Sequence, residues 1–243
     1  MATAGALQDA TFKTKGAGSD FNNKDNWEEG YVPTGIATIP QGFIGPITFS
    51  KPATTFATFK TLAYTGFIIA AGQTVTLTGA GVVTPEKGTP EFGVFGTLEG
   101  QVRLDGTQAN ASKLYGTGTI KGSVENIGGT VNPGSSYGGS GTLTIDGSYL
   151  QKSGGPDKFT NLNIGAVPGR PSARLTVTGR VQLSEDNSGL VIIMDNPAGV
   201  ATNVTFIALS SGAGLNGVFG AVSCTRPQMP VVNYDANNVN VTV

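Results

Sequence analysis

Apolar and polar residues alternate in several short segments of the chain. The clearest are QTVTLTG (73–79), GTLTIDG (141–147), RLTVTG (174–179) and NVNVTV (238–243). A period of two residues places one apolar row on one face of a strand and the polar row on the other. Gly or Asn residues flank these segments and act as turn signals. The pattern therefore predicts short strands that each bury one face.

Glycine and proline limit how long any helix can be. The chain contains 37 Gly and 13 Pro, and the longest internal gap between them is ATTFATFKTLAYT (53–65). Thr and Phe dominate that gap, and both fit strands better than helices. We therefore predict an all-β chain. Strands are expected near 47–49, 67–70, 74–78, 82–84, 94–98, 101–104, 118–120, 130–132, 142–145, 162–164, 175–177, 181–183, 190–194, 204–209, 218–222 and 239–243.

A loose repeat bears on how these strands are arranged. The segments AGQTVTLTGAG (71–81), GSGTLTIDGS (139–148) and ARLTVTGRVQL (173–183) each contain an apolar-Thr-apolar core followed by a Gly. Such units fit a β-solenoid, in which a strand turns at glycine and each coil contacts only its neighbours. An antiparallel β-sandwich also explains the alternation, but it does not explain the repeated small-residue corners. The β-solenoid is therefore favoured and the antiparallel β-sandwich is the alternative.

Composition excludes several classes of function. Only 13% of the residues are charged, the formal net charge is -1, and the chain has one Cys and no His. Catalysis and metal binding that depend on imidazole are excluded, as is an internal disulfide framework. A near-neutral chain without a basic cluster is not expected to bind nucleic acid. No stretch approaches the roughly 18 apolar residues of a membrane-spanning helix.

Candidate functional side chains are few. The carboxylates are dispersed, and no pair stands out as the two facing acids of a glycosidase, so we predict no catalytic residue and no cofactor. Asp20, Asn22 and Asp25 form an oxygen-rich cluster that is a weak candidate for Ca²⁺, although the spacing is not that of an EF-hand. Trp27 is a candidate for stacking on a sugar ring. The favoured interpretation is that Trp27, with Phe21 and Tyr31, covers the open end of the first coil.

One segment, GTGTIKGSVENIGGTVNPGSSYGGSGTLTIDGSYLQ (116–151), resembles the passenger segments of bacterial autotransporters and related large surface proteins. Those coils follow the pattern N-x-G-x-[VIL]-x-P-G-x-S, then G-T-L-T-I-x-G-x-Y-x-Q. Residues 19–33 are similar to an opening of the same kind of protein, and residues 206–222 and 232–243 look like its closing coils. The likeness covers about two thirds of the chain. The matching positions are Asn126, Gly128, Gly129, Val131, Pro133, Gly134, Ser135, Gly141, Thr142, Leu143, Thr144, Ile145, Gly147, Tyr149 and Gln151.

The resemblance implies a right-handed parallel β-solenoid (β-helix) in a single domain. We expect an N-terminal cap at 1–45, coils at 46–203 and closing coils at 204–243. It also implies a secreted or cell-surface location and a non-enzymatic structural or adhesive role. The expected partner is a cell-surface or extracellular glycan or protein, and end-to-end assembly or a homo-oligomer is a further expectation. The alternative is a solenoid that binds or degrades polysaccharide.

Overall fold

The computed structural model describes residues 6–16, 18–62, 64–85, 88–107, 110–134, 139–166, 171–194, 205–225 and 229–243. Within these ranges the chain forms strands and a single 3₁₀ turn, η1 (Lys24–Asn26). The prediction of an all-β chain is confirmed. The segment 53–65, in which Phe residues also fall at roughly helical spacing, forms strand β4 (Ala53–Thr61).

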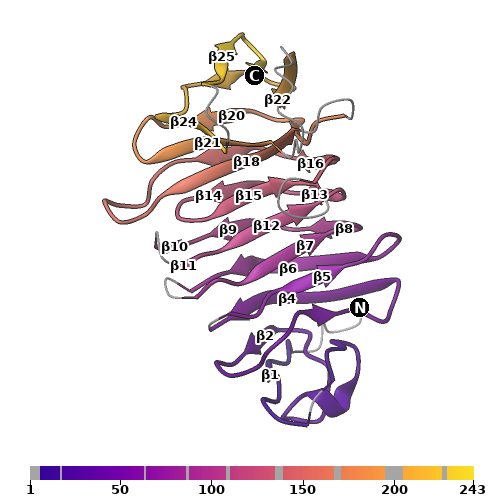
Figure 1. Cartoon of the computed structure of the whole chain (residues 1–243). Coiled ribbons are helices and arrows are strands. Elements are labelled where there is room, and N and C mark those ends of the chain that lie inside the picture. Colours follow the sequence, from indigo (N-terminus) through magenta and orange to yellow (C-terminus); the bar gives the residue numbers. More distant parts are fainter. Residues whose placement is uncertain are drawn as a thin grey trace.

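The strands are short and follow one another closely along the chain (Figure 1). The first half contains β1 (Ala10–Thr11), β2 (Ile36–Ile39), β3 (Ile47–Thr48), β4, β5 (Phe67–Ile69), β6 (Thr74–Val83), β7 (Glu91–Val94), β8 (Thr97–Glu99), β9 (Val102–Leu104), β10 (Gly106–Thr107), β11 (Asn110–Ala111), β12 (Lys113–Gly116) and β13 (Thr119–Lys121). The second half contains β14 (Val124–Asn126), β15 (Thr130–Pro133), β16 (Thr142–Asp146), β17 (Tyr149–Gln151), β18 (Thr160–Ala166), β19 (Arg174–Val177), β20 (Val181–Leu183), β21 (Ser188–Met194), β22 (Thr205–Ser211), β23 (Leu215–Asn216), β24 (Ala221–Cys224), β25 (Val231–Tyr234) and β26 (Asn238–Thr242).

Most strands pair in parallel with the equivalent strand of the preceding and following turn of the chain. One sheet contains the parallel rows β8–β13–β16–β19–β22 and β9–β14–β17–β20–β23, which meet at the long strand β6. The other large sheet is β3–β5–β7–β12–β15–β18–β21–β24, and it is parallel throughout. Among the described strands, only β10–β11 and β22–β26–β25 pair antiparallel. This pairing is not that of an antiparallel β-sandwich.

The repeated segments of the sequence are neighbours in this arrangement. In β16 and β19, Leu143, Thr144 and Ile145 face Leu175, Thr176 and Val177 in order. The number of residues between paired positions varies, which explains why the sequence shows no strict period. The interval is 22 residues for three side-chain pairs between β7–β9 and β12–β14, and 32 residues between Asp146 and Thr178.

Apolar residues at equivalent positions stack on one another inside the molecule. Leu98, Ile120 and Ile145 occupy one such column and are completely buried. Phe92, Leu114 and Val131 belong to another column, on the strands of the second large sheet. Burying an aliphatic side chain of this size contributes about 1.5–3 kcal/mol relative to leaving it in water. The buried apolar residues of most strands together form one continuous hydrophobic core.

Glycine is required where consecutive turns of the chain touch at a corner. Gly116, which ends β12, has a φ of +134°, a conformation that other residues rarely adopt. A Cβ atom there would lie 1.9 Å from the carbonyl oxygen of Val94. The corner of one turn therefore rests directly on the backbone of the turn before it.

The two ends of the stack differ from its middle. At the N-terminal end an aromatic cluster is packed beneath β2 and β4, and Phe12, Phe21 and Trp27 are completely buried in it. At the C-terminal end the antiparallel hairpin β25–β26 pairs with β22. Val239 and Val241 of this hairpin are buried. The hairpin ends the parallel pairing along the edge of β22.

Candidate functional site

Two of the three side chains of the calcium candidate, those of Asp20 and Asn22, bind backbone groups, and the third residue, Asp25, lies in the 3₁₀ turn η1. One carboxylate oxygen of Asp20 accepts hydrogen bonds from the backbone N–H groups of Asn22 (3.0 Å) and Ser50 (3.1 Å). The side-chain oxygen of Asn22 accepts from the backbone of Ser50 and Lys51. Within the described ranges, no group of three or more acidic, His or Cys residues is placed to hold a metal ion. The cluster thus joins two loops, and calcium binding here stays a prediction.

Trp27 lies inside the N-terminal aromatic cluster. Its ring makes edge-on contacts with Phe12 and Phe21 at centroid distances of 4.9 and 5.0 Å. The indole N–H donates to the backbone carbonyl of Phe21 at 2.8 Å. Because the side chain is completely buried, neither ring face is available to a sugar. Trp27 is therefore part of a hydrophobic cover at the end of the stack, and Tyr31 packs against the same core.

Three polar residues of the passenger-like motif meet inside the molecule. Asn126 and Gln151 face each other on β14 and β17, and both are completely buried. The Tyr149 hydroxyl donates to the side-chain oxygen of Gln151 at 2.6 Å. The Gln151 amide donates to the Ser188 hydroxyl (3.1 Å) and to the carbonyl of Gly189 (3.0 Å). The Gln151 side chain therefore links β17 in one large sheet to β21 in the other.

The remaining motif positions shape the backbone. The side-chain oxygen of Asn126 accepts from the backbone N–H of Gly129, next to Gly128 at the turn before β15. Pro133 ends β15, and the backbone N–H of Gly134 donates to the carbonyl of Gly116. Ser135 lies outside the described residues. Of the other positions, Gly141 and Gly147 are corner glycines, and Val131, Leu143 and Ile145 are buried. Thr142 and Thr144 lie on the outer face of β16.

Burial also affects the acidity of Tyr149. With 1% of its surface exposed, the side chain is out of contact with water, and burial raises the pKa of its hydroxyl well above the ordinary value of 10.0. Tyr149 therefore stays protonated and acts as a hydrogen-bond donor. The buried motif residues Asn126, Tyr149 and Gln151 form an internal support that a ligand could not reach.

Polar residues form regular columns on the outer face of the larger sheet. Five threonines occupy equivalent positions of β6, β8, β13, β16 and β19. The adjacent column contains Glu99, Lys121 and Asp146. Glu99 and Lys121 form an ion pair at 3.0 Å, and this hydrogen bond lowers the pKa of the Glu99 carboxyl. The threonine column is Thr74, Thr97, Thr119, Thr144 and Thr176.

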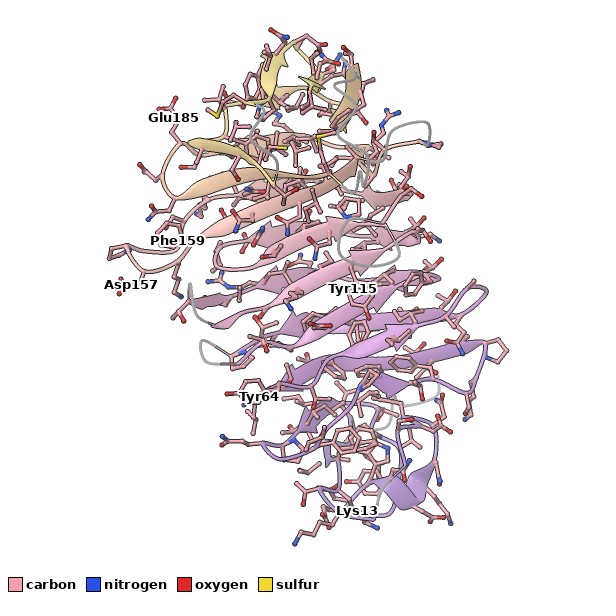
Figure 2. The ribbon with its side chains drawn as sticks, viewed as in Figure 1. Lys13, Tyr64, Tyr115, Asp157, Phe159 and Glu185 are labelled. Atoms are coloured by element: carbon pink, nitrogen blue, oxygen red, sulfur yellow. The ribbon has the colours of Figure 1, made fainter. Side chains whose placement is uncertain are left out.

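Two adjoining hollows lie where the loops before β18 and β21 meet. One has a volume of about 520 Å³ and is lined by residues of 153–156 and 185–187. The other, of about 240 Å³, includes Phe159, Asn161 and the first residues of β21 and β24. Glu185 and Asn187 line both hollows, which we therefore treat as one feature, the loop groove. Figure 2 shows Asp157, Phe159 and Glu185 on the same side of the molecule.

Asn187 joins the two loops that form the groove. It has a φ of 45° and is the only residue besides glycine with a positive φ in the described part of the chain. Its side-chain amide donates to the carbonyl of Pro156 at 3.3 Å, and its carbonyl accepts from the backbone of Thr160 at 3.0 Å. Asn tolerates this left-handed conformation better than other side chains do.

The loop groove was not predicted from the sequence. Glu185, Asp186 and Asp157 were part of the dispersed set of carboxylates, and Phe159 carried no recognisable motif. The loops come together only because β18 and β21 pair in parallel. The one available signal was the long, charged insertion GGPDKFT between the Tyr149–Gln151 pair and the next strand.

The chain matches no model of a known protein family and no curated protein. No described helix has the length and apolar character that crossing a membrane requires.

Proposed function

We propose that this chain is a non-enzymatic extracellular surface module of the autotransporter-passenger type, built as a right-handed β-solenoid. The observation that carries the proposal is the placement of the motif residues. Asn126 and Gln151 are register partners on adjacent parallel strands, and the Tyr149 hydroxyl donates to Gln151 beside them. A motif that recurs from coil to coil in a solenoid needs this stacking of equivalent positions.

The role follows from what such a stack presents to its surroundings. Its faces carry long columns of partly exposed polar side chains, and loops of different lengths project at the corners between them (Figure 2). Three ion pairs join the turn that contains β7–β9 to the next one, which stiffens the faces: Glu91–Lys113, Glu99–Lys121 and Arg103–Glu125. A rigid scaffold of this kind presents loops for adhesion or spaces other domains from a surface.

Self-association belongs to the same proposal. Strand β25 is the outer strand of its sheet, with β26 on one side only. Val231 at its start is 58% exposed, and Met229 just before it is 82% exposed. An unpaired strand edge with apolar neighbours is a site at which another strand can add. We propose that a second copy of the chain pairs there, giving a dimer or an end-to-end assembly.

A carbohydrate-binding or carbohydrate-degrading solenoid is the second candidate. The loop groove favours it, because an aromatic ring, amide side chains and carboxylates line one concave surface. Incubation with neutral and acidic polysaccharides, followed by measurement of new reducing ends and unsaturated products, separates binding from degradation. Sustained product formation would replace the proposed role with an enzymatic one.

The location is tested on the cells that carry the gene. Antibodies against the purified chain should label intact cells or detect the chain in the culture medium. Brief protease treatment of intact cells should remove the cell-bound signal, while a cytoplasmic marker stays unchanged. Labelling that requires permeabilised cells, with nothing in the medium, would contradict the proposal.

A further inference from the structure

We infer that the loop groove is a glycan-binding site that takes a neutral or amino-sugar chain in preference to an acidic one. The inference rests on the proposed surface role and gives it a partner class. The groove runs along the side of the molecule where the loops before β18, β21 and β24 end. It is open to solvent, so an internal stretch of a long chain can lie in it as well as a chain end.

The groove is held in shape by hydrogen bonds within and between its loops. The Ser153 hydroxyl donates to the carbonyl of Lys158 at 2.8 Å and accepts from the backbone N–H of Gly155 at 3.1 Å. Asn187 ties the second loop to Pro156. A site formed before the ligand arrives loses little conformational entropy on binding.

An ion pair anchors the first loop to the body of the molecule. The Lys158 ammonium lies 2.6 Å from a carboxylate oxygen of Asp105, and both side chains are largely buried. Asp105 comes immediately before β10, so this contact connects segments that are 53 residues apart. The 153–159 loop is therefore fixed at its base, and Phe159, the next residue along the chain, takes its position from that anchor.

The lining has the chemistry that recognises a sugar. Phe159 is partly exposed and supplies a flat apolar surface for the C–H face of a pyranose ring. Asn161 and Asn187 offer amide donors and acceptors to hydroxyl groups, and Glu185 offers an ionised acceptor. Ligand sites in proteins commonly combine an apolar surface with a few such convergent polar groups. Gly189 leaves room for this arrangement, because a Cβ there would lie 2.4 Å from the side-chain oxygen of Asn161.

The charge of the lining selects among glycans. Glu185 and Asp186 line the groove, and neither Lys nor Arg is among its described lining residues. A uronic acid placed there would meet like charges at short range without a compensating cation, which is unfavourable even in a solvated site. Neutral sugars accept hydrogen bonds from the amides and donate to the carboxylates. Free amino sugars gain an attraction as well.

The test uses an oligosaccharide array followed by calorimetric titration of the full chain. The probes are oligosaccharides of glucose, mannose, N-acetylglucosamine, glucosamine and galacturonic acid. We expect at least one neutral or amino-sugar probe to bind and galacturonic acid oligomers not to bind. Phe159→Ala should weaken the binding about tenfold, which corresponds to about 1.4 kcal/mol.

Two further variants test the polar groups of the lining, and the urea unfolding of each is compared with that of the parent chain, because the Asn187 amide also joins the two loops of the groove through Pro156. Asn187→Gly keeps the left-handed backbone but removes the amide, and Glu185→Gln removes the charge from an exposed side chain. Asn187→Gly should weaken binding severalfold. Glu185→Gln should reduce the discrimination against galacturonic acid oligomers. Tyr64→Ala is the matched control, because Tyr64 is an exposed aromatic residue that lies away from the groove, nearer the N-terminal end of the stack (Figure 2).

The inference is overturned by three results. These are no binding of any neutral or amino-sugar probe, preference for the galacturonic acid oligomers, or affinity that Phe159→Ala and Asn187→Gly leave unchanged. Each of these results concerns the groove alone. Failure of the surface role is read separately, from the labelling of intact cells, so the two failures are distinguishable.

Discussion

Replacing Tyr149 by Phe tests whether the buried motif residues support the stack as described. The substitution removes one hydroxyl and keeps the ring in the core. The side-chain oxygen of Gln151 then loses the donor that lies 2.6 Å away. Because Gln151 is completely buried, water cannot replace that donor. An unsatisfied buried acceptor costs about 1–3 kcal/mol, so Tyr149→Phe should lower the free energy of unfolding by that amount.

Replacing Gln151, the acceptor of this hydrogen bond, gives a second check on the loss of unfolding free energy. Gln151→Leu removes the amide that bonds Ser188 and Gly189, and it leaves the Tyr149 hydroxyl without its acceptor. We expect a loss of about 2–4 kcal/mol. The double variant, Tyr149→Phe with Gln151→Leu, removes both the donor and the acceptor of the Tyr149–Gln151 hydrogen bond, so neither group is left unpaired. The double variant should therefore lose about 1–2 kcal/mol less than the sum of the single losses.

The assay is urea unfolding followed by far-ultraviolet circular dichroism. Tyr31→Phe is the control, because its hydroxyl donates to the carbonyl of Asp9 at an exposed position, where water can take over. The control should cost well under about 1 kcal/mol. A Tyr149→Phe variant as stable as this control, or strictly additive losses in the double variant, would refute the assignment of a buried network.

Three further predictions follow from contacts described above. Gly116→Ala should have a markedly lower urea midpoint of unfolding than Gly72→Ala, because both glycines have a positive φ but only at Gly116 would a Cβ clash with a backbone carbonyl. Equal midpoints for the two variants would contradict the close corner contact. Above about pH 10 the unfolded chain loses the Tyr149 proton while the folded chain keeps it, so stability should fall with rising pH, and less so in Tyr149→Phe; identical alkaline pH profiles for the two proteins would contradict this. Val231→Lys should reduce self-association at high concentration, as measured by sedimentation velocity, relative to the equally charged Tyr64→Lys; a strictly monomeric parent chain would refute pairing at β25.

The sequence predicted the fold class well because strand signals are local. Frequent Gly and Pro excluded long helices, and alternation located most strands. The repeat also predicted correctly that 139–148 and 173–183 are equivalent, since β16 and β19 pair in order. The expected strands did not include β1, β2, β4, β10, β11, β12, β14, β17, β23 and β25. All of these except β4 are only two to four residues long, and β4 lies in the segment 53–65, where the Phe residues do not alternate strictly with polar ones.

The candidate site was much less predictable. The loop groove depends on the pairing of β18 with β21, which brings Pro156 and Asn187 together although they are 31 residues apart. No local pattern reports such a contact. For Trp27 the sequence left two roles open, because a single tryptophan looks the same in a sequence whether it covers a core or binds a sugar. The favoured interpretation, a cover shared with Phe21 and Tyr31, agrees with the burial of Trp27, whereas the contact with Phe12 was not predicted because only the folded chain brings that ring to it.

The most direct test of the proposed role is whether the folded chain adheres to extracellular material. Fluorescently labelled chain should bind saturably to intact cells or to isolated extracellular matrix, and unlabelled chain should compete for that binding. Heat-unfolded chain should not bind, and the surface material should be recovered chemically unchanged. Non-saturable binding that is equal for folded and unfolded chain, or steady breakdown of the surface polysaccharide, would contradict the account.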